Sequence, residues 1–275
     1  SFVGSFSTNI IVLIISILPF IFFSNLKGKN ALLVILLMPI LILLFSGIFR
    51  YCNKTVTKST DQLITIIQPN IKQKNKWIFK NREQHLKKLL NLSFKYHNSF
   101  NDKNRIIIWP ETSFEGSIPN ETELLSNISK KVLLNKYTTL ILGVLRTDEN
   151  KVFNSLVFLN SNGDIIHNYD KIKLVPFGEY IPFRQYLGVL TDFLPPKDFA
   201  SGKLKPNANI NGFDNIITLI CYEILFTNEI VRRLSKNTNL LINITNDAWF
   251  GKTIGPYQHL ALAKIKAVEF GLSLA

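Results

Sequence analysis

The amino-terminal 49 residues are the feature that most limits what this chain can fold into. Residues 1–26 contain no charged side chain, and the run from Phe2 to Phe23 is long enough to cross a bilayer as a helix. A second uncharged apolar run extends from Ala31 to Phe49. A secretory signal peptide needs a basic start and a small-residue cleavage site, and the first run has neither. We therefore predict that residues 1–50 form a hairpin of two transmembrane helices.

The charges around this hairpin do not settle its orientation. Lys27 and Lys29 lie in the short polar turn between the two runs and favour a cytoplasmic turn. Arg50, Lys54 and Lys58 follow the second run and favour the opposite orientation. The positive-inside rule alone therefore leaves both topologies open.

The remainder of the chain has the pattern of an α/β domain. After a polar linker over residues 51–62, short apolar runs alternate with segments of helical periodicity up to residue 275. Strands are expected at 63–67, 106–109, 140–144, 152–159, 165–169, 216–221 and 240–245, helices at 77–97, 121–136, 259–270 and between the last two strands, and a loop at 190–211. In such domains the site lies at the carboxyl ends of strands.

Chemically useful side chains stand at three of these strand ends. Glu111 follows a β-branched run that ends at Trp-Pro, Lys171 and Lys173 precede a Val-Pro-Phe-Gly turn, and Cys221 ends an apolar run. Each has an ordinary alternative, since cysteine is often a small buried hydrophobe and strand-end charges are often only solvated. Their occurrence together, in the order Glu, Lys, Cys, predicts a covalent active site.

These three residue types suit acyl transfer through a thioester. A free thiol is mostly protonated near neutrality, so a carboxylate that takes its proton produces the nucleophile. A lysine, with the backbone N–H of Tyr222, can stabilise the oxyanion of a tetrahedral intermediate. The pattern predicts acyl transfer through a covalent enzyme and does not identify the acyl donor.

Several stretches resemble the nitrilase (carbon–nitrogen hydrolase) superfamily and, within it, the apolipoprotein N-acyltransferase family. They are Ile67-Gln-Pro-Asn70 with Trp77, Trp109-Pro-Glu111, Phe153-Asn-Ser-Leu156, Lys171 through Tyr180, Ile220-Cys-Tyr-Glu223 and Asn243 through Gly251. This resemblance implies an α-β-β-α sandwich over residues 63–275. It implies that Glu111 is the base, Lys171, rather than Lys173, the catalytic lysine, and Cys221 the nucleophile. The positions implied to support the site are Glu179, Tyr222 and Glu223, and those implied to bind substrate are Trp77, Phe177, Trp249 and Phe250.

The resemblance also implies a reaction and a location. A fatty acyl chain would pass from a phospholipid, through the cysteine thioester, to the amino-terminal amine of a diacylglyceryl-cysteine apolipoprotein, with no cofactor. The protein would be a multi-pass protein of the bacterial inner membrane with its catalytic domain on the periplasmic side. Members of the family continue beyond both ends of this sequence, so the chain is expected to be truncated at both ends and its catalytic domain incomplete at the carboxyl terminus.

Two alternatives remain open at this stage. One is a membrane-tethered nitrilase-type amidase, in which water opens the thioester and a C–N bond is hydrolysed. The other is an inactive lipid-binding fragment. Large apolar side chains at Trp77, Trp249 and Phe250, beside two apolar spans, favour a lipid donor over the amidase. The expected loss of the carboxyl-terminal strands favours the inactive fragment.

Composition and motifs argue against other classes of function. The formal net charge of +13 indicates an anionic partner, and because the basic residues are spread along the chain, a phospholipid surface suits it better than nucleic acid. There is no dinucleotide fingerprint, phosphate loop or Gly-x-Ser-x-Gly elbow, and the four histidines lack metal-ligand spacing. His259 is expected to be structural. The two cysteines, Cys52 and Cys221, do not make a disulfide framework, and both are expected to be free.

Overall fold

A computed structural model describes the chain except for residues 1–4, 54–61, 96–103, 134–136, 187–197 and 211. The chain divides into two compact units, an amino-terminal helical unit and a larger unit that begins at residue 61. Most of the linker predicted over residues 51–62 lies outside the described residues, as do residues 190–197 and 211 of the loop predicted over 190–211.

The amino-terminal unit consists of two helices, α1 (Ser5–Phe23) and α2 (Lys29–Cys52). They are joined by a turn in which Gly28 adopts a φ of +79°, a conformation that glycine adopts without a steric penalty. Among the described residues, one helix is long and apolar enough to cross a membrane, over Lys29–Phe49 with a mean hydropathy of 3.0. The apolar part of α1, Asn9–Phe23, is shorter. The first predicted span therefore stays a prediction.

The larger unit contains two sheets. The six-stranded sheet has the order β1 (Leu63–Ile66), β2 (Arg105–Ile108), β4 (Thr138–Asp148), β5 (Lys151–Leu159) and β6 (Ile165–Asp170), with β3 (Ser117–Ile118) paired to β4. The four-stranded sheet has the order β10 (Ser273–Leu274), β9 (Leu240–Ile244), β8 (Phe213–Ile220) and β7 (Ala208–Ile210). Neighbouring strands are parallel except at β4–β5, β5–β6 and β7–β8, which are antiparallel.

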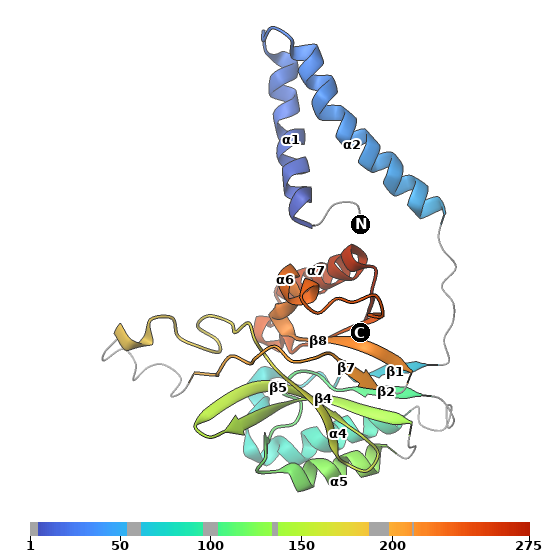
Figure 1. Ribbon diagram of the computed structural model, residues 1–275. Helices are drawn as coiled ribbons and strands as arrows, with labels where there is room; N and C mark the ends of the chain where they lie inside the picture. Colours follow the sequence, from blue (N-terminus) through green and yellow to red (C-terminus); the bar gives the residue numbers. More distant parts are fainter. Residues whose placement is uncertain (1–4, 54–61, 96–103, 134–136, 187–197, 211) are drawn as a thin grey trace. The chain divides into compact units, whose positions relative to one another are not determined.

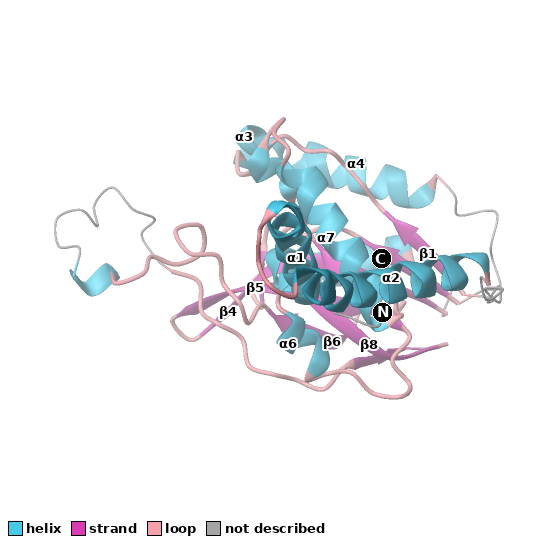
Figure 2. Ribbon diagram, turned by 90° about the horizontal axis from the view of Figure 1, so that it is seen from above, coloured by secondary structure: helices cyan, strands magenta, loops and turns pink. Residues whose placement is uncertain are grey.

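Helices cover the outer face of each sheet. On one side lie α4 (Arg82–Phe94) and α5 (Thr122–Val132), and on the other lie α6 (Thr227–Val231) and α7 (Gly255–Phe270) (Figures 1 and 2). Shorter turns are α3 (Gln73–Lys76), η1 (Phe79–Asn81), η3 (Arg184–Tyr186), η5 (Cys221–Leu225) and η6 (Asp247–Phe250). The α-β-β-α sandwich implied by the resemblance is therefore confirmed.

Strand β2 shows why the two sheets stack. Ile107 belongs to the core beneath α4 and α5, whereas Ile106 and Ile108 belong to the core between the two sheets. Successive side chains of a strand point to opposite faces, so a run of isoleucines is buried on both sides. This central position carries the residues that follow Ile108 into the interior of the unit.

Some predicted elements differ from the observed ones. The helix predicted over 77–97 begins at Arg82 and its described part ends at Phe94, because Ile78 is extended and interrupts the helical stretch. The helix predicted over 121–136 ends at Val132. Strand β7 lies in the segment predicted as a loop, with Ala208 and Ile210 buried against β8. Three residues are too few for a periodic signal, so the sequence did not indicate this strand.

Candidate active site

The three strand-end residues come together in the interior. Glu111 follows β2, Lys171 follows β6 and Cys221 follows β8. The ammonium nitrogen of Lys171 lies 3.6 Å from Oε1 of Glu111. Both charges act on the Cys221 thiol, since Glu111 raises and Lys171 lowers its pKa. The structure therefore brings together the Glu, Lys and Cys that the sequence ordered along the chain.

The carboxylate of Glu111 is buried and held on both oxygens. Asn154 donates to Oε1 at 2.7 Å, and the backbone N–H of Asn246 donates to Oε2 at 3.0 Å. The next residue, Thr112, has a φ of +46°, an uncommon conformation for a β-branched residue. The turn passes so close to β4 that a Cβ on Gly143 would lie 2.3 Å from the Thr112 nitrogen. Glycine at position 143 is therefore a steric requirement for this placement of Glu111.

Lys171 is 1% exposed and lies between two carboxylates. Its ammonium donates to Oε1 of Glu179 at 2.9 Å. Glu179 in turn accepts from Asn154 at 2.8 Å and from the backbone N–H of Val175 at 2.9 Å. Burial lowers the pKa of Lys171, but the charges of Glu111 and Glu179 outweigh it and raise the pKa above its usual value. The lysine is therefore a cation at neutral pH.

The neighbouring Lys173 has a different environment. Its side chain is 42% exposed, and its ammonium lies 3.7 Å from Oε1 of Glu229. It therefore lies outside the cluster of Glu111, Lys171 and Cys221, and the two lysines that the sequence places two residues apart have separate surroundings.

Cys221 stands at a strained elbow between β8 and η5. Its φ is +55°, in the left-handed region that non-glycine residues rarely adopt. Burial raises the pKa of the thiol to about 12, with the charge of Glu111 adding to the rise and Lys171 and Thr245 opposing it. The thiol is therefore protonated at rest, and nucleophilic attack requires a base, for which the adjacent Glu111 is available.

Glu223 joins the elbow to the lysine-bearing segment. One oxygen accepts from the backbone N–H groups of Ile172 at 2.7 Å and Lys173 at 3.0 Å, and the other accepts from Ile220 at 2.9 Å. The Tyr169 hydroxyl donates to both oxygens. Glu223 is thus a fully buried tie between the ends of β6 and β8.

The aromatic residues predicted to bind substrate lie on the surface. Trp77, Phe177, Trp249 and Phe250 are between 47% and 73% exposed. Trp249 and Phe250 therefore do not belong to the core. Tyr222 is partly buried and stacks edge-on against Phe226, with ring centroids 5.0 Å apart.

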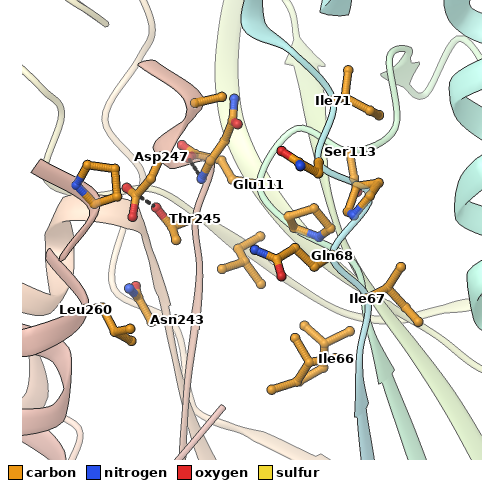
Figure 3. Close-up of a pocket in the computed structure, with 18 of the residues that line it drawn as sticks. Ile66, Ile67, Gln68, Ile71, Glu111, Ser113, Asn243, Thr245, Asp247 and Leu260 are labelled. Atoms are coloured by element: carbon orange, nitrogen blue, oxygen red, sulfur yellow. Dashed lines mark hydrogen bonds between the residues drawn. The ribbon is translucent and has the colours of Figure 1, made fainter. Parts of the chain in front are cut away.

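A cavity of about 560 Å³ adjoins the Glu111 side of the cluster (Figure 3). Its walls come from the ends of β1 and β2 and from β9, η6 and α7. Glu111, Gln68 and Asn243 line it (Figure 3), and neither Lys171 nor Cys221 is among its lining residues. The cavity therefore reaches the carboxylate directly, and Thr245 and Asp247, which line it, are neighbours of the Cys221 thiol.

One group of side chains has the spacing of a metal site. The donor atoms of Cys221, Asp247 and His259 lie within 4.8 Å of one another. However, Nδ1 of His259 is 2.8 Å from Oδ1 of Asp247, and Nε2 is 3.2 Å from the backbone oxygen of Cys221. Both ring nitrogens already face protein acceptors at hydrogen-bond distance, and we assign no metal there.

Two polar residues that hold this cluster together have no role in the sequence-based prediction. Asn154 bridges Glu111 and Glu179, and a buried asparagine within the apolar strand β5 was a signal that could have been used. Lys76 is buried and donates to Thr112 Oγ1 at 2.5 Å and to the Glu111 backbone oxygen at 3.2 Å. In sequence it is indistinguishable from the nearby Lys72 and Lys74.

The sequence of the larger unit identifies its family. Residues 63–272 match the carbon–nitrogen hydrolase family. The chain belongs to this family. The described architecture agrees with that of a solved member of the nitrilase superfamily, the NitN amidase from Nesterenkonia sp. AN1, with a TM-score of 0.51 and 17% identity over 77% of this chain and 76% of that chain.

Curated relatives within this family share one name. A protein from Allorhizobium ampelinum named apolipoprotein N-acyltransferase is 34% identical over 220 residues, covering 77% of this chain and 41% of the relative. A protein of the same name from Rhizobium etli is 36% identical over 229 residues, again covering 77% and 41%. The chain therefore spans less than half the length of these relatives.

Proposed function

We propose that this carbon–nitrogen hydrolase domain is the catalytic part of an apolipoprotein N-acyltransferase. The observation that carries the proposal is the buried contact between Glu111 and Lys171 beside a protonated Cys221 thiol. The name shared by the curated relatives supports the choice of reaction. The exposed Trp249 and Phe250 support a lipid as the donor.

The first half-reaction loads the enzyme. Glu111 takes the thiol proton as the sulfur of Cys221 attacks the ester carbonyl carbon of a phospholipid. The oxyanion that forms is stabilised by the Lys171 ammonium and the Tyr222 backbone N–H. When the intermediate collapses, the C–O bond breaks, the lysophospholipid oxygen takes the proton from Glu111, and the acyl chain remains on sulfur as a thioester.

The second half-reaction transfers the acyl chain from Cys221 to the acceptor amine. The amino-terminal amine of a diacylglyceryl-cysteine apolipoprotein attacks the thioester carbonyl while Glu111 accepts an amine proton. The C–S bond breaks, an amide forms, and the proton on Glu111 returns to the sulfur of Cys221. No electron acceptor is needed, and the base and thiol end in their starting states.

We further propose a membrane setting for this reaction. Residues 1–50 form two spans, with the Lys27–Lys29 turn in the cytoplasm and the catalytic domain on the periplasmic side of a bacterial inner membrane. The apolar helix over Lys29–Phe49 supports the anchoring. The orientation rests on the family resemblance, and a cytoplasmic turn with Lys27 and Lys29 agrees with it.

Trapping the acyl-enzyme tests the proposal. The detergent-solubilised protein is incubated with phospholipid, and the adduct is located by peptide mass spectrometry before and after hydroxylamine. We expect a hydroxylamine-sensitive acyl group on the peptide that contains Cys221, and none on that peptide in Cys221→Ala. Cys52, which is free and exposed, serves as the internal control for nonspecific acylation.

Varying the acceptor peptide distinguishes an acyltransferase from a hydrolase. A diacylglyceryl-cysteine peptide with a free amine should discharge the thioester much faster than the same peptide with a blocked amine. Equal discharge with both peptides would favour the nitrilase-type amidase. Absence of any adduct on Cys221 would favour the inactive lipid-binding fragment.

A further inference from the structure

His259 lies against the backbone of the nucleophile. It is a buried residue of α7, with 9% of its surface exposed. Its Nδ1 is 2.8 Å from Oδ1 of Asp247 in η6, and its Nε2 is 3.2 Å from the backbone oxygen of Cys221. One imidazole therefore connects the two segments that follow β8 and β9.

Both of these partners accept hydrogen bonds. A backbone carbonyl oxygen carries no proton, and an aspartate carboxylate is ionised at neutral pH. A neutral imidazole has one N–H and can donate to only one of them, whereas an imidazolium donates to both. The hydrogen bond to Asp247 raises the pKa of His259, burial opposes the rise, and the Cys221 carbonyl and the charge of Glu111 add to it. The geometry and the electrostatics both favour the doubly protonated ring.

The carbonyl that His259 contacts belongs to a functional peptide bond. The Cys221 carbonyl and the Tyr222 N–H are part of one planar unit and point in opposite directions. Because Cys221 has a φ of +55°, the backbone does not hold this plane through an ordinary strand or helix conformation. A charged donor on the carbonyl side fixes the plane and polarises the peptide, which makes the N–H on the other side a stronger donor.

We propose that His259, kept as an imidazolium by Asp247, is a positioning residue that orients the Cys221–Tyr222 peptide so that the Tyr222 N–H faces the oxyanion. The proposal rests on the proposed function only in needing a thioester-forming attack at Cys221. It does not depend on which ester supplies the acyl group or which nucleophile removes it.

The test compares two reactions of the same thiol. Acylation by a small aryl ester develops an oxyanion, whereas alkylation by iodoacetamide is a displacement that develops none. In His259→Leu, which cannot donate, we expect acylation to slow by about tenfold to a hundredfold, within the range for a lost oxyanion donor, and alkylation to change less than about threefold. His259→Gln retains one donor and should lose less acylation than His259→Leu.

A matched control is available in the same domain. His85 is equally buried, on α4, and its Nδ1 lies 2.6 Å from Oε1 of Glu115. His85→Gln removes a buried histidine–carboxylate contact outside the site and should leave both reactions unchanged. Equal slowing of acylation and alkylation in the His259 variants would overturn the proposal. Unfolding would be recognised by accelerated alkylation, because the thiol would become exposed.

A direct observation of the ring stands independently of activity. In protein labelled with ¹⁵N histidine, with His259→Gln used to assign the signal, both ring nitrogens of His259 should have imidazolium shifts at pH 7. The titrating or charged groups that face the ring are Asp247, Glu111 and the Cys221 thiol. In Asp247→Asn, which lacks the carboxylate, the His259 nitrogens should instead have the shifts of a neutral imidazole at pH 7. A neutral ring in the wild type would overturn the proposal. Failure of phospholipid to acylate Cys221 would instead contradict the proposed function and leave these two tests intact.

Discussion

A buried oxygen of Glu223 accepts the backbone N–H of Ile172 at 2.7 Å, which ties the residue after Lys171 to the elbow that carries the thiol. The same side chain accepts from Lys173 and, through its other oxygen, from Ile220. All of these partners are donors, so only a carboxylate satisfies them together. Glu223 therefore holds the segment that carries Lys171 and the segment that carries Cys221 in place relative to one another.

Replacing Glu223 with glutamine should destabilise the domain. The amide NH₂ would face at least one backbone N–H that has lost its acceptor. A buried donor without an acceptor costs about 1–3 kcal/mol of stability, and the cost is larger where the lost partner was charged. Tyr169→Phe removes only the hydroxyl donor and should cost about 1 kcal/mol. Thermal unfolding of both variants measures the difference, and equal midpoints for Glu223→Gln and the wild type would contradict the role as a tie.

The two lysines near the site should behave differently. Lys171→Met removes the buried cation beside Glu111. It should raise the activation free energy of acyl-enzyme formation by about 3 kcal/mol, which slows this step about a hundredfold. Lys173→Met is the matched control, because its side chain is 42% exposed and paired with Glu229. Rates of Cys221 acylation measure both. A larger loss in Lys173→Met would reverse the assignment.

Lys76 should make the stability of the domain depend on pH in the alkaline range. Burial lowers its folded pKa to about 8 from 10.5, and the charges of Glu111 and Glu115 oppose this only in part. Between these values the unfolded chain binds a proton that the folded protein lacks, so the free energy of unfolding should rise with pH from about 8 to about 10.5, by at most about 3 kcal/mol.

The comparison with Lys76→Met isolates this contribution. The difference in unfolding free energy between wild type and variant should be independent of pH below 8 and should shift in favour of the wild type above it. Denaturant unfolding at pH 7, 8, 9 and 10 measures the trend. A constant difference across this range would show that the buried amine keeps an ordinary pKa.

The exposed aromatic pair should affect lipid reactions selectively. Trp249→Ala with Phe250→Ala should impair acylation of Cys221 from phospholipid vesicles, because these exposed side chains are proposed to contact the acyl chain or the membrane. Alkylation of the thiol by iodoacetamide should change little. Ile166→Ala, an exposed apolar residue on β6, is the control for general loss of apolar surface. Normal acylation from vesicles in the double variant would favour the amidase alternative.

The proposed orientation predicts a labelling pattern in intact cells. In a Cys52→Ser background, cysteine at Asn25 in the turn should be protected from a membrane-impermeant reagent, and cysteine at the exposed Asn162 should react. Permeabilised cells, in which both positions should react, are the control. Labelling of position 25 and protection of position 162 would invert the topology.

The sequence alone determined the elements that carry the site. The isoleucine run of β2 predicts a doubly buried strand, Pro110 ends it, and the residue delivered at its end is Glu111. Likewise the apolar run before Cys221 predicts the elbow. Local patterns are sufficient here because strand formation and termination depend on residues that are neighbours in the chain.

Only the tertiary structure decided which side chains share the interior. Lys171 and Lys173 have similar surroundings in the sequence, but Glu179 and Glu111 enclose one of them while the other remains partly exposed. The roles of Asn154 and His259 depend on partners from other strands and helices. Burial and hydrogen bonding between distant segments arise from the packing of the two sheets, and no local pattern contains that information.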